Sequence, residues 1–179
     1  MKILITRHGQ TDWNLQKKVQ GQVDIPLNDE GRNEAREIHE KLKSENIDLI
    51  ISSPLGRAKE TAEIIRGDRD IKITLDERII ERAYGINEGK MRVEFDFAGF
   101  WDWDANKNIE EVEKIQDFYS RVYGFLDEII KEYKDKTILL VSHAGTSIPL
   151  RAYLNNVEPK DAAKEVRRLD NCEVDSYDL

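Results

Sequence analysis

The chain has 179 residues, of which 39% are hydrophobic and 36% are charged, and its formal net charge at pH 7 is −8. This length fits a single domain, and the clustering of the apolar residues indicates a folded core rather than a disordered chain. The acidic charge excludes a general attraction to nucleic acid or to anionic membranes, so an anionic ligand requires a few cations that converge locally.

Four short apolar runs predict buried strands. In chain order they are residues 2–6, 48–51, 71–75 and 137–141. Apolar residues at helical spacing lie between these runs and predict amphipathic helices. The helices are expected after Asn28, after Ser53-Pro54, over residues 109–133 and over residues 146–154. Asn28 and Ser53 are the predicted N-caps, and Pro54 is expected in the first turn of its helix.

The alternation of strands and helices predicts an α/β fold, a three-layer α/β/α sandwich around a mostly parallel central sheet. No repeat or low-complexity linker divides the chain, so residues 1–179 are expected to form one domain. Residues 91–108 contain the aromatic stretch FDFAGFWDWD and are expected to form a short cap or lid.

Cysteine usage and the start of the chain bear on the cellular compartment. Cys172 is the only cysteine, which excludes a disulfide within the chain and is typical of a reducing compartment. The first apolar run is too short for a signal peptide, and no run approaches the length of a membrane span. We therefore expect a soluble, cytoplasmic protein.

Three of the predicted strands lead into polar residues. The first strand runs into Arg7 and His8, and the second leads through two serines to Arg57. The fourth ends at Ser142 and His143. In parallel α/β sheets the carboxyl ends of neighbouring strands meet at one edge, where ligands bind. We therefore expect these side chains to share one cleft.

The chemistry of this set points to phosphate. Two guanidinium groups suit an oxyanion, and a neutral imidazole can attack phosphorus to give a phosphohistidine. The departing alkoxide then needs a proton from a carboxylic acid. The candidates for this acid are Glu77 and Glu81, in the stretch DERIIERAYG.

Five blocks in order along the chain resemble the histidine phosphatase superfamily, which includes cofactor-dependent phosphoglycerate mutases. The blocks are TRHGQTDWN (6–14), QGQVDIPLNDEGRNEA (20–35), SSPLGRAKETA (52–62), ERAYG (81–85) and VSHAG (141–145). The resemblance implies that His8 is the nucleophile and that Glu81, rather than Glu77, is the general acid. It also implies a phosphate pocket made by Arg7, Arg57 and His143. Further substrate contacts are implied for Asn14, Gln20, Gly21, Tyr84, Arg92 and the backbone of Ala144.

The chain departs from the family pattern in three places. Asn87 stands where the family often has tryptophan, and residues 108–110 replace its usual Gly-Glu-Ser. The segment 91–108 is shorter than the corresponding insertion of glycolytic mutases, and its only cations are Arg92 and Lys107. The short segment favours a phosphatase.

The expected activity is metal-independent hydrolysis of a small phosphomonoester through a phosphohistidine on His8. Two alternatives stay open: a phosphoglycerate mutase, which would use 2,3-bisphosphoglycerate as its cofactor, and a non-catalytic binder of phosphorylated ligands. For the phosphatase no cofactor is expected. The expected partner is a small phosphorylated metabolite and neither nucleic acid nor a membrane, and a homodimer is left open.

Overall fold

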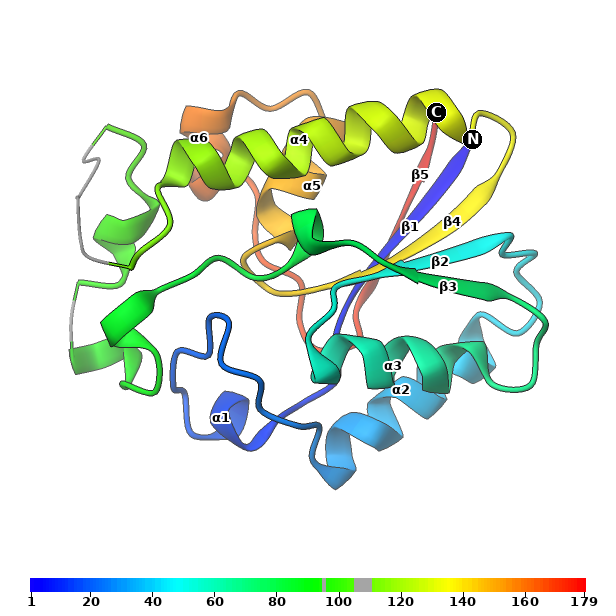
Figure 1. Ribbon diagram of the computed structural model, residues 1–179, viewed down its shortest axis with the longest axis horizontal. Coiled ribbons are helices and arrows are strands. Elements are labelled where there is room, and N and C mark those ends of the chain that lie inside the picture. The colour runs from blue at the N-terminus through cyan, green and yellow to red at the C-terminus, as the bar shows by residue number, and fades with distance from the viewer. Residues whose placement is uncertain (95, 105–110) are drawn as a thin grey trace.

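The computed structural model describes residues 1–94, 96–104 and 111–179. The described residues form a five-stranded sheet with the strand order β3-β2-β4-β1-β5 (Figure 1). The strands are β1 (Lys2–Arg7), β2 (Leu49–Ser52), β3 (Lys72–Leu75), β4 (Thr137–Ser142) and β5 (Val174–Asp178). The first four strands are parallel, and β5 runs antiparallel to β1 at one edge.

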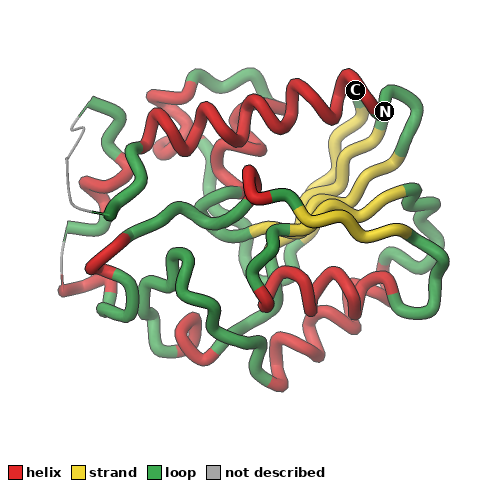
Figure 2. Tube along the Cα trace, in the orientation of Figure 1, coloured by secondary structure: helices red, strands yellow, loops and turns green. Residues whose placement is uncertain are grey.

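Helices cover both faces of the sheet (Figure 2). The helices α2 (Asp29–Lys41) and α3 (Gly56–Arg66) lie on one side, and α4 (Ile115–Glu132) lies on the other (Figure 1). The remaining helices are the short α1 (Asp12–Leu15), α5 (Ser147–Leu154) and α6 (Pro159–Glu165). The predicted α/β/α sandwich around a mostly parallel sheet is confirmed.

The alternation of side chains along each strand divides the core between the two faces. Leu4 belongs to the apolar cluster that contains Ala62 of α3. Its neighbours Ile3 and Ile5 belong to the cluster that contains Phe118 of α4. Both faces of the central strands are therefore buried, which explains why their sequences are continuous apolar runs without alternating polar residues.

The N-terminus of α2 is as predicted, and that of α3 is not. The side chain of Asn28 accepts a hydrogen bond from the backbone N–H of Gly31 and caps α2. In contrast, α3 begins at Gly56 with Leu55 at the N-cap position, without a capping side chain. Ser53 and Pro54 both precede this helix: the Ser53 hydroxyl accepts from the N–H of Leu55 at 3.4 Å and lies 2.7 Å from His143 Nε2, and Pro54 is not in the first turn.

The aromatic segment between the acid block and α4 is packed against the core. Its described part contains two 3₁₀ turns, η3 (Arg92–Glu94) and η4 (Ala98–Trp101). Phe100 and Trp101 are buried, and the Trp101 ring lies edge-on to Phe118 of α4, with 6.1 Å between the ring centroids.

Some of the residues named in the predictions for this part of the chain are not described by the structure, and the predicted start of the long helix is wrong. Residue 95 and residues 105–110, including Lys107 and the segment 108–110, lie outside the described residues. The longest helix begins at Ile115 rather than at residue 109, with Lys114 as its N-cap. No helix in the described ranges combines the length and apolarity that a membrane crossing requires.

Two elements after residue 154 were not predicted. Helix α6 begins with Pro159 at its N-terminus. Strand β5 has the sequence VDSYD, whose polar residues give no buried-strand pattern. Within the described sheet it is an edge strand, paired with β1 alone, so part of its surface is exposed and its sequence carries little signal.

Candidate active site

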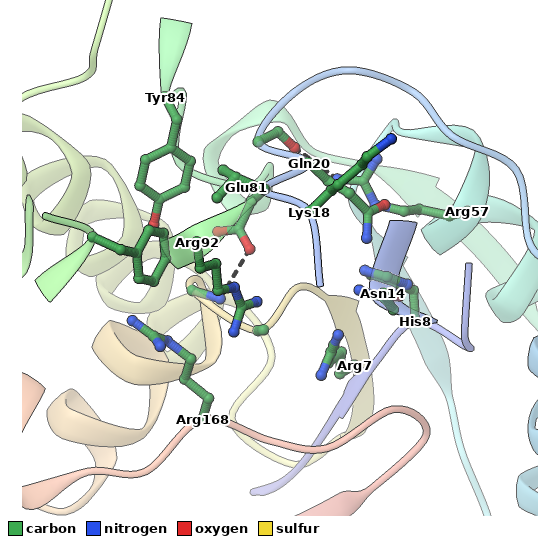
Figure 3. Close-up of a pocket in the computed structure, with 15 residues that line it drawn as sticks. Arg7, His8, Asn14, Lys18, Gln20, Arg57, Glu81, Tyr84, Arg92 and Arg168 are labelled. Carbon is green, nitrogen blue, oxygen red and sulfur yellow. Dashed lines mark hydrogen bonds between the residues drawn. The ribbon is translucent and has the colours of Figure 1, made fainter. Parts of the chain in front are cut away.

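The register of the sheet brings the predicted strand ends together. Arg7 pairs with Ser142 across β1 and β4, and Ser52 pairs with Val141 across β2 and β4. The residues that follow these pairs, including His8 and His143, therefore lie at one edge of the sheet. A pocket opens at this edge (Figure 3).

The His8 ring is held in one tautomer. Its Nδ1 lies 2.7 Å from the carbonyl oxygen of Gly9. A carbonyl oxygen can only accept, so Nδ1 carries the proton and donates it. In the neutral ring, Nε2 then bears the free lone pair that a nucleophile needs.

The surroundings of His8 keep its imidazole neutral. Its side chain is only 3% exposed, and Arg57 and Arg7 lie nearby. Burial, followed by the charges of Arg57 and Arg7, holds the pKa of His8 well below its ordinary value of 6.5. The unprotonated ring is therefore the dominant form at neutral pH.

Arg57 is a buried cation and Arg7 a half-buried one, and both are positioned by backbone carbonyl groups. Arg7 Nη1 donates to the carbonyl of Leu169, and Arg57 donates through Nη1 and Nη2 to the carbonyls of Val23 and Gly21. The Nε atom of each arginine is buried without a partner in the described part of the chain. Burial lowers the pKa of Arg7 to about 10 and also lowers that of Arg57, so both groups are charged at neutral pH.

His143 lies beside His8 and contacts Ser53. The two imidazole rings are tilted, with 5.2 Å between their centroids. His143 Nε2 is 2.7 Å from the Ser53 hydroxyl oxygen, and its Nδ1 is buried without a partner among the described residues. His143 is fully buried, and Ala144 and Gly145 form the pocket wall at this point.

Glu81 is fixed by two backbone N–H groups. Its Oε1 accepts from the N–H of Arg82 and its Oε2 from the N–H of Gly145, both at 2.9 Å; the second bond is dashed in Figure 3. Gly145 permits this approach, since a β-carbon at this position would lie 2.3 Å from Glu81 Oε1. Glu81 lines the pocket, whereas Glu77 is exposed and outside it.

The loop that carries Gln20 and Gly21 is held by Glu88. The Glu88 carboxylate accepts hydrogen bonds from the backbone N–H groups of Gln22 (3.0 Å), Val23 (3.1 Å) and Tyr84 (2.9 Å). Gly21 has a φ of +53°, and a side chain there would also collide with Glu88. Gln20, Gly21 and Tyr84 all line the pocket, and their contact with a substrate stays a prediction.

This arrangement is what a phosphoryl-transfer site requires. The neutral imidazole of His8 lines the same pocket as the guanidinium groups of Arg7 and Arg57 and the carboxylate of Glu81. A family model for the histidine phosphatase superfamily (branch 1) matches residues 3–179. The chain belongs to this superfamily.

Individual known proteins resemble the chain along most of its length. It is 38% identical over 169 residues to the "uncharacterized phosphatase PhoE" of Bacillus subtilis (strain 168). The aligned region covers 94% of this chain and 83% of that protein. It is 32% identical over 186 residues to the "probable phosphoglycerate mutase GpmB" of Salmonella arizonae, covering 99% of this chain and 85% of that one. The structure of YhfR from Bacillus stearothermophilus superposes with a TM-score of 0.88 at 30% identity, covering 98% and 89% of the two chains.

The structure adds residues to this histidine phosphatase site that sequence reasoning missed. Asn171 donates from Nδ2 to the carbonyl of His8 at 2.9 Å, and lies 3.4 Å from the side-chain oxygen of Asn14. Lys18 and Arg168 also line the pocket. Lys18 lies between two predicted blocks, and Arg168 and Asn171 lie in a segment where no element was predicted. No role was predicted for Glu88, which follows the atypical Asn87.

Proposed function

We propose that this protein is a phosphatase that hydrolyses a small phosphomonoester through a phosphohistidine on His8. The observation that carries the proposal is the state of the His8 ring. Its Nδ1–H is donated to the Gly9 carbonyl, so Nε2 carries the lone pair, and burial together with the charges of Arg57 and Arg7 keeps the ring unprotonated. This is the form of imidazole that attacks phosphorus.

In the first half-reaction, His8 Nε2 forms a bond to phosphorus while the bond from phosphorus to the ester oxygen breaks. Arg7 and Arg57 stabilise the negative charge on the phosphoryl oxygens. Glu81, in its protonated form, gives its proton to the departing alkoxide, which leaves as an alcohol. The Gly9 carbonyl stabilises the positive charge that the imidazole ring acquires.

In the second half-reaction, water attacks the phosphohistidine and Glu81 takes a proton from that water. The bond between phosphorus and Nε2 breaks, inorganic phosphate leaves, and His8 returns to its neutral tautomer. Positive charge comes from the arginines, so we propose that neither a metal nor a cofactor takes part. The protons of the two half-reactions balance, because Glu81 is protonated again at the end of the cycle.

We further propose a cytoplasmic enzyme with a small phosphorylated metabolite as its partner, rather than nucleic acid or a membrane; a homodimer stays a prediction. The net charge of −8 supports this ligand class, because the cations of the site are concentrated inside one pocket. The single cysteine supports a reducing compartment.

The second candidate is a phosphoglycerate mutase, favoured by the similarity to the GpmB relative. In a mutase, a hydroxyl group of the bound sugar acid takes the phosphoryl group in place of water, and 2,3-bisphosphoglycerate primes the enzyme. The same His8 and Glu81 would serve both reactions, so the two activities are distinguished by the acceptor.

The test compares phosphate release from p-nitrophenyl phosphate with the conversion of 3-phosphoglycerate to 2-phosphoglycerate in the presence of 2,3-bisphosphoglycerate. Rapid acid-free quenching after reaction with radiolabelled substrate traps the phosphoenzyme. We expect phosphate release and an acid-labile, alkali-stable phosphohistidine, both abolished in His8→Ala. A His8→Ala variant with near-wild-type turnover would refute the mechanism. Ligand binding without any phosphoenzyme would identify a non-catalytic binder.

A further inference from the structure

Asp24 lies in the second sequence block (20–35), and the proposed chemistry does not use it. It is not among the described residues that line the pocket, and its side chain is 50% exposed. Its carboxylate nevertheless contacts two consecutive residues at the start of α3. Oδ2 accepts a hydrogen bond from the backbone N–H of Gly56 at 2.8 Å, and Oδ1 lies 3.8 Å from Arg57 Nη1.

The N-terminus of α3 depends on this distant carboxylate. Leu55, at the N-cap position, forms no capping hydrogen bond through its side chain, and the first turn contains no acidic residue. The first N–H groups of a helix have no acceptor within the helix, and a carboxylate beside them is favourable through hydrogen bonding and through the helix dipole. Asp24 supplies that carboxylate from 32 residues earlier in the chain.

Gly56 leaves the space that this contact needs. A β-carbon on residue 56 would lie 3.0 Å from Asp24 Oδ2 and 3.4 Å from its Oδ1. Either the carboxylate or the helix would then have to shift. The absence of a side chain therefore lets the Asp24 carboxylate reach the N–H and remain close to the guanidinium group of the next residue.

The loop that carries Asp24 also holds the guanidinium group of Arg57. This group is only 1% exposed and donates to the carbonyls of Gly21 at 2.7 Å and Val23 at 2.8 Å. In Figure 3, Arg57 lies beside Gln20 of the same loop. The loop provides the acceptors and α3 provides the arginine, so the guanidinium group stays in place only if the two keep their relative position. The hydrogen bond from the first N–H of α3 to Asp24 joins them directly.

Asp24 also acts on the charge of Arg57. Burial lowers the pKa of Arg57, and the carboxylates of Glu81 and then of Asp24 oppose this shift. Glu81 lines the pocket, whereas Asp24 approaches the guanidinium group from the loop that holds it. The Asp24 carboxylate therefore offsets part of the cost of burying this cation without occupying the space of a phosphate group.

We propose that Asp24 is a positioning residue for Arg57. By joining its loop to the N-terminus of α3, it keeps the guanidinium group where the phosphoryl oxygens bind. Asp24 acts through Arg57 and does not touch the substrate. This inference rests on the proposed phosphatase function, in which Arg57 stabilises the phosphoryl group, and it adds a residue outside the pocket to that function.

The test compares Asp24→Ala with Asp24→Asn. Two quantities are measured: the Kd of inorganic phosphate, by NMR titration, and the KM of p-nitrophenyl phosphate. In Asp24→Ala the N–H of Gly56 loses its acceptor and Arg57 loses its fixed position, so we expect both constants to rise about tenfold. In Asp24→Asn the amide oxygen can still accept from this N–H, and asparagine caps helices as well as aspartate does. We expect this variant to return both constants to within about threefold of the wild type.

A double-variant cycle tests whether the effect passes through Arg57. In the Arg57→Gln background, Asp24→Ala should raise the Kd of inorganic phosphate by less than about twofold, because the group that Asp24 positions is already absent. A further tenfold rise in this background would show that Asp24 acts independently of Arg57 and would overturn the proposal.

Asp48→Ala is the matched control. The Asp48 carboxylate accepts from the backbone N–H of Thr137 at 2.8 Å and from Lys136 Nζ at 3.0 Å, at the start of β4 and therefore away from the strand ends that form the site. We expect it to lower the urea concentration at the midpoint of unfolding and to leave Kd and KM unchanged. A partly unfolded sample lowers the apparent kcat, but Kd and KM describe the folded molecules, so a merely structural role of Asp24 would not move them.

The remaining outcomes separate this inference from the proposed function. Unchanged Kd and KM in Asp24→Ala, equal weakening in both Asp24 variants, or tighter phosphate binding in both overturn the positioning role, since the last two assign the effect to charge alone. A wild-type protein that binds inorganic phosphate with the expected dependence on Asp24, but hydrolyses no phosphate ester, refutes the phosphatase function and leaves the positioning of Arg57 standing.

Discussion

The backbone N–H of Gly145 donates to Glu81 Oε2 at 2.9 Å, and a β-carbon on residue 145 would lie 2.3 Å from Glu81 Oε1. Glu81, the proposed general acid, is thus positioned by the absence of a side chain in a segment 64 residues away. The carboxylate and the glycine form one unit, so a methyl group at residue 145 would force the acid out of place.

We therefore expect Gly145→Ala to lower kcat for alkyl phosphate esters by about 100-fold, within the range for loss of general acid catalysis. The loss for p-nitrophenyl phosphate should be smaller, since nitrophenolate leaves with little help from a proton. Steady-state kinetics with both substrates measures the difference. Gly124→Ala in α4 is the matched control, because its β-carbon would meet nothing within 4 Å. Equal losses for both substrates would contradict this account of Glu81.

The depressed pKa of His8 sets the response of phosphoenzyme formation to acid. Because burial, Arg57 and Arg7 keep the ring unprotonated, kcat/KM corrected for substrate ionisation should not decline as the pH falls through about 6.5, the ordinary value for histidine. Titration of isotopically labelled histidine by NMR locates the pKa directly. In Arg57→Gln, loss of one cation should move the pKa of His8 upward; no change would show that Arg57 does not act on this ring.

Two buried histidines also make the stability of the fold depend on pH. Burial, and then nearby charges, lower the pKa values of His8 and His143 well below 6.5. Below that pH the unfolded chain binds more protons than the folded one, so the free energy of unfolding falls as the solution becomes more acidic. Each histidine contributes a slope that approaches about 1.4 kcal/mol per pH unit, and this contribution is flat above pH 6.5.

Urea unfolding between about pH 7.5 and about pH 5.5 measures this slope. This pH interval lies above the range in which unperturbed carboxylates titrate, so their protonation does not contribute to the slope. The double variant His8→Asn, His143→Asn should show a much flatter dependence, whatever its absolute stability. A wild-type curve with no slope in this interval would contradict the burial of both rings as neutral groups.

Glu88 joins the Gln22–Val23 backbone to that of Tyr84 through three accepted hydrogen bonds. Its replacement by alanine leaves these N–H groups without an acceptor, at a cost of roughly 1–3 kcal/mol in the free energy of unfolding. The loop with Gln20 and Gly21 then loses its fixed position, and we expect KM to rise more than kcat falls. Glu88→Gln keeps one side-chain oxygen, so its KM and its free energy of unfolding should lie between those of the wild type and the alanine variant. Steady-state kinetics and urea unfolding measure both quantities. A fall in kcat at constant KM would instead place Glu88 in the chemical step.

The residues at the reaction centre were predictable because they follow strand ends. Arg7 and His8 come directly after one apolar run and His143 after another, and parallel pairing forces such ends to one edge. The error at Ser53 has a different origin. A serine before a proline and a helix is the usual pattern of an N-cap, but the helix begins later, at Gly56, and the position of His143 decides that the Ser53 hydroxyl also contacts an imidazole.

By itself, the sequence determined the superfamily, the α/β class and the motifs that contain His8, Glu81, Arg7 and Arg57, since each of these is encoded in a short local pattern. Only the tertiary structure decided that Arg168 and Asn171 join the site. Strand β5 pairs antiparallel with β1, and the N–H of Cys172 donates to the carbonyl of Arg7 at 3.1 Å. This pairing places the segment before β5 against the end of β1. The sequence of a polar edge strand contains no local pattern that predicts such a pairing.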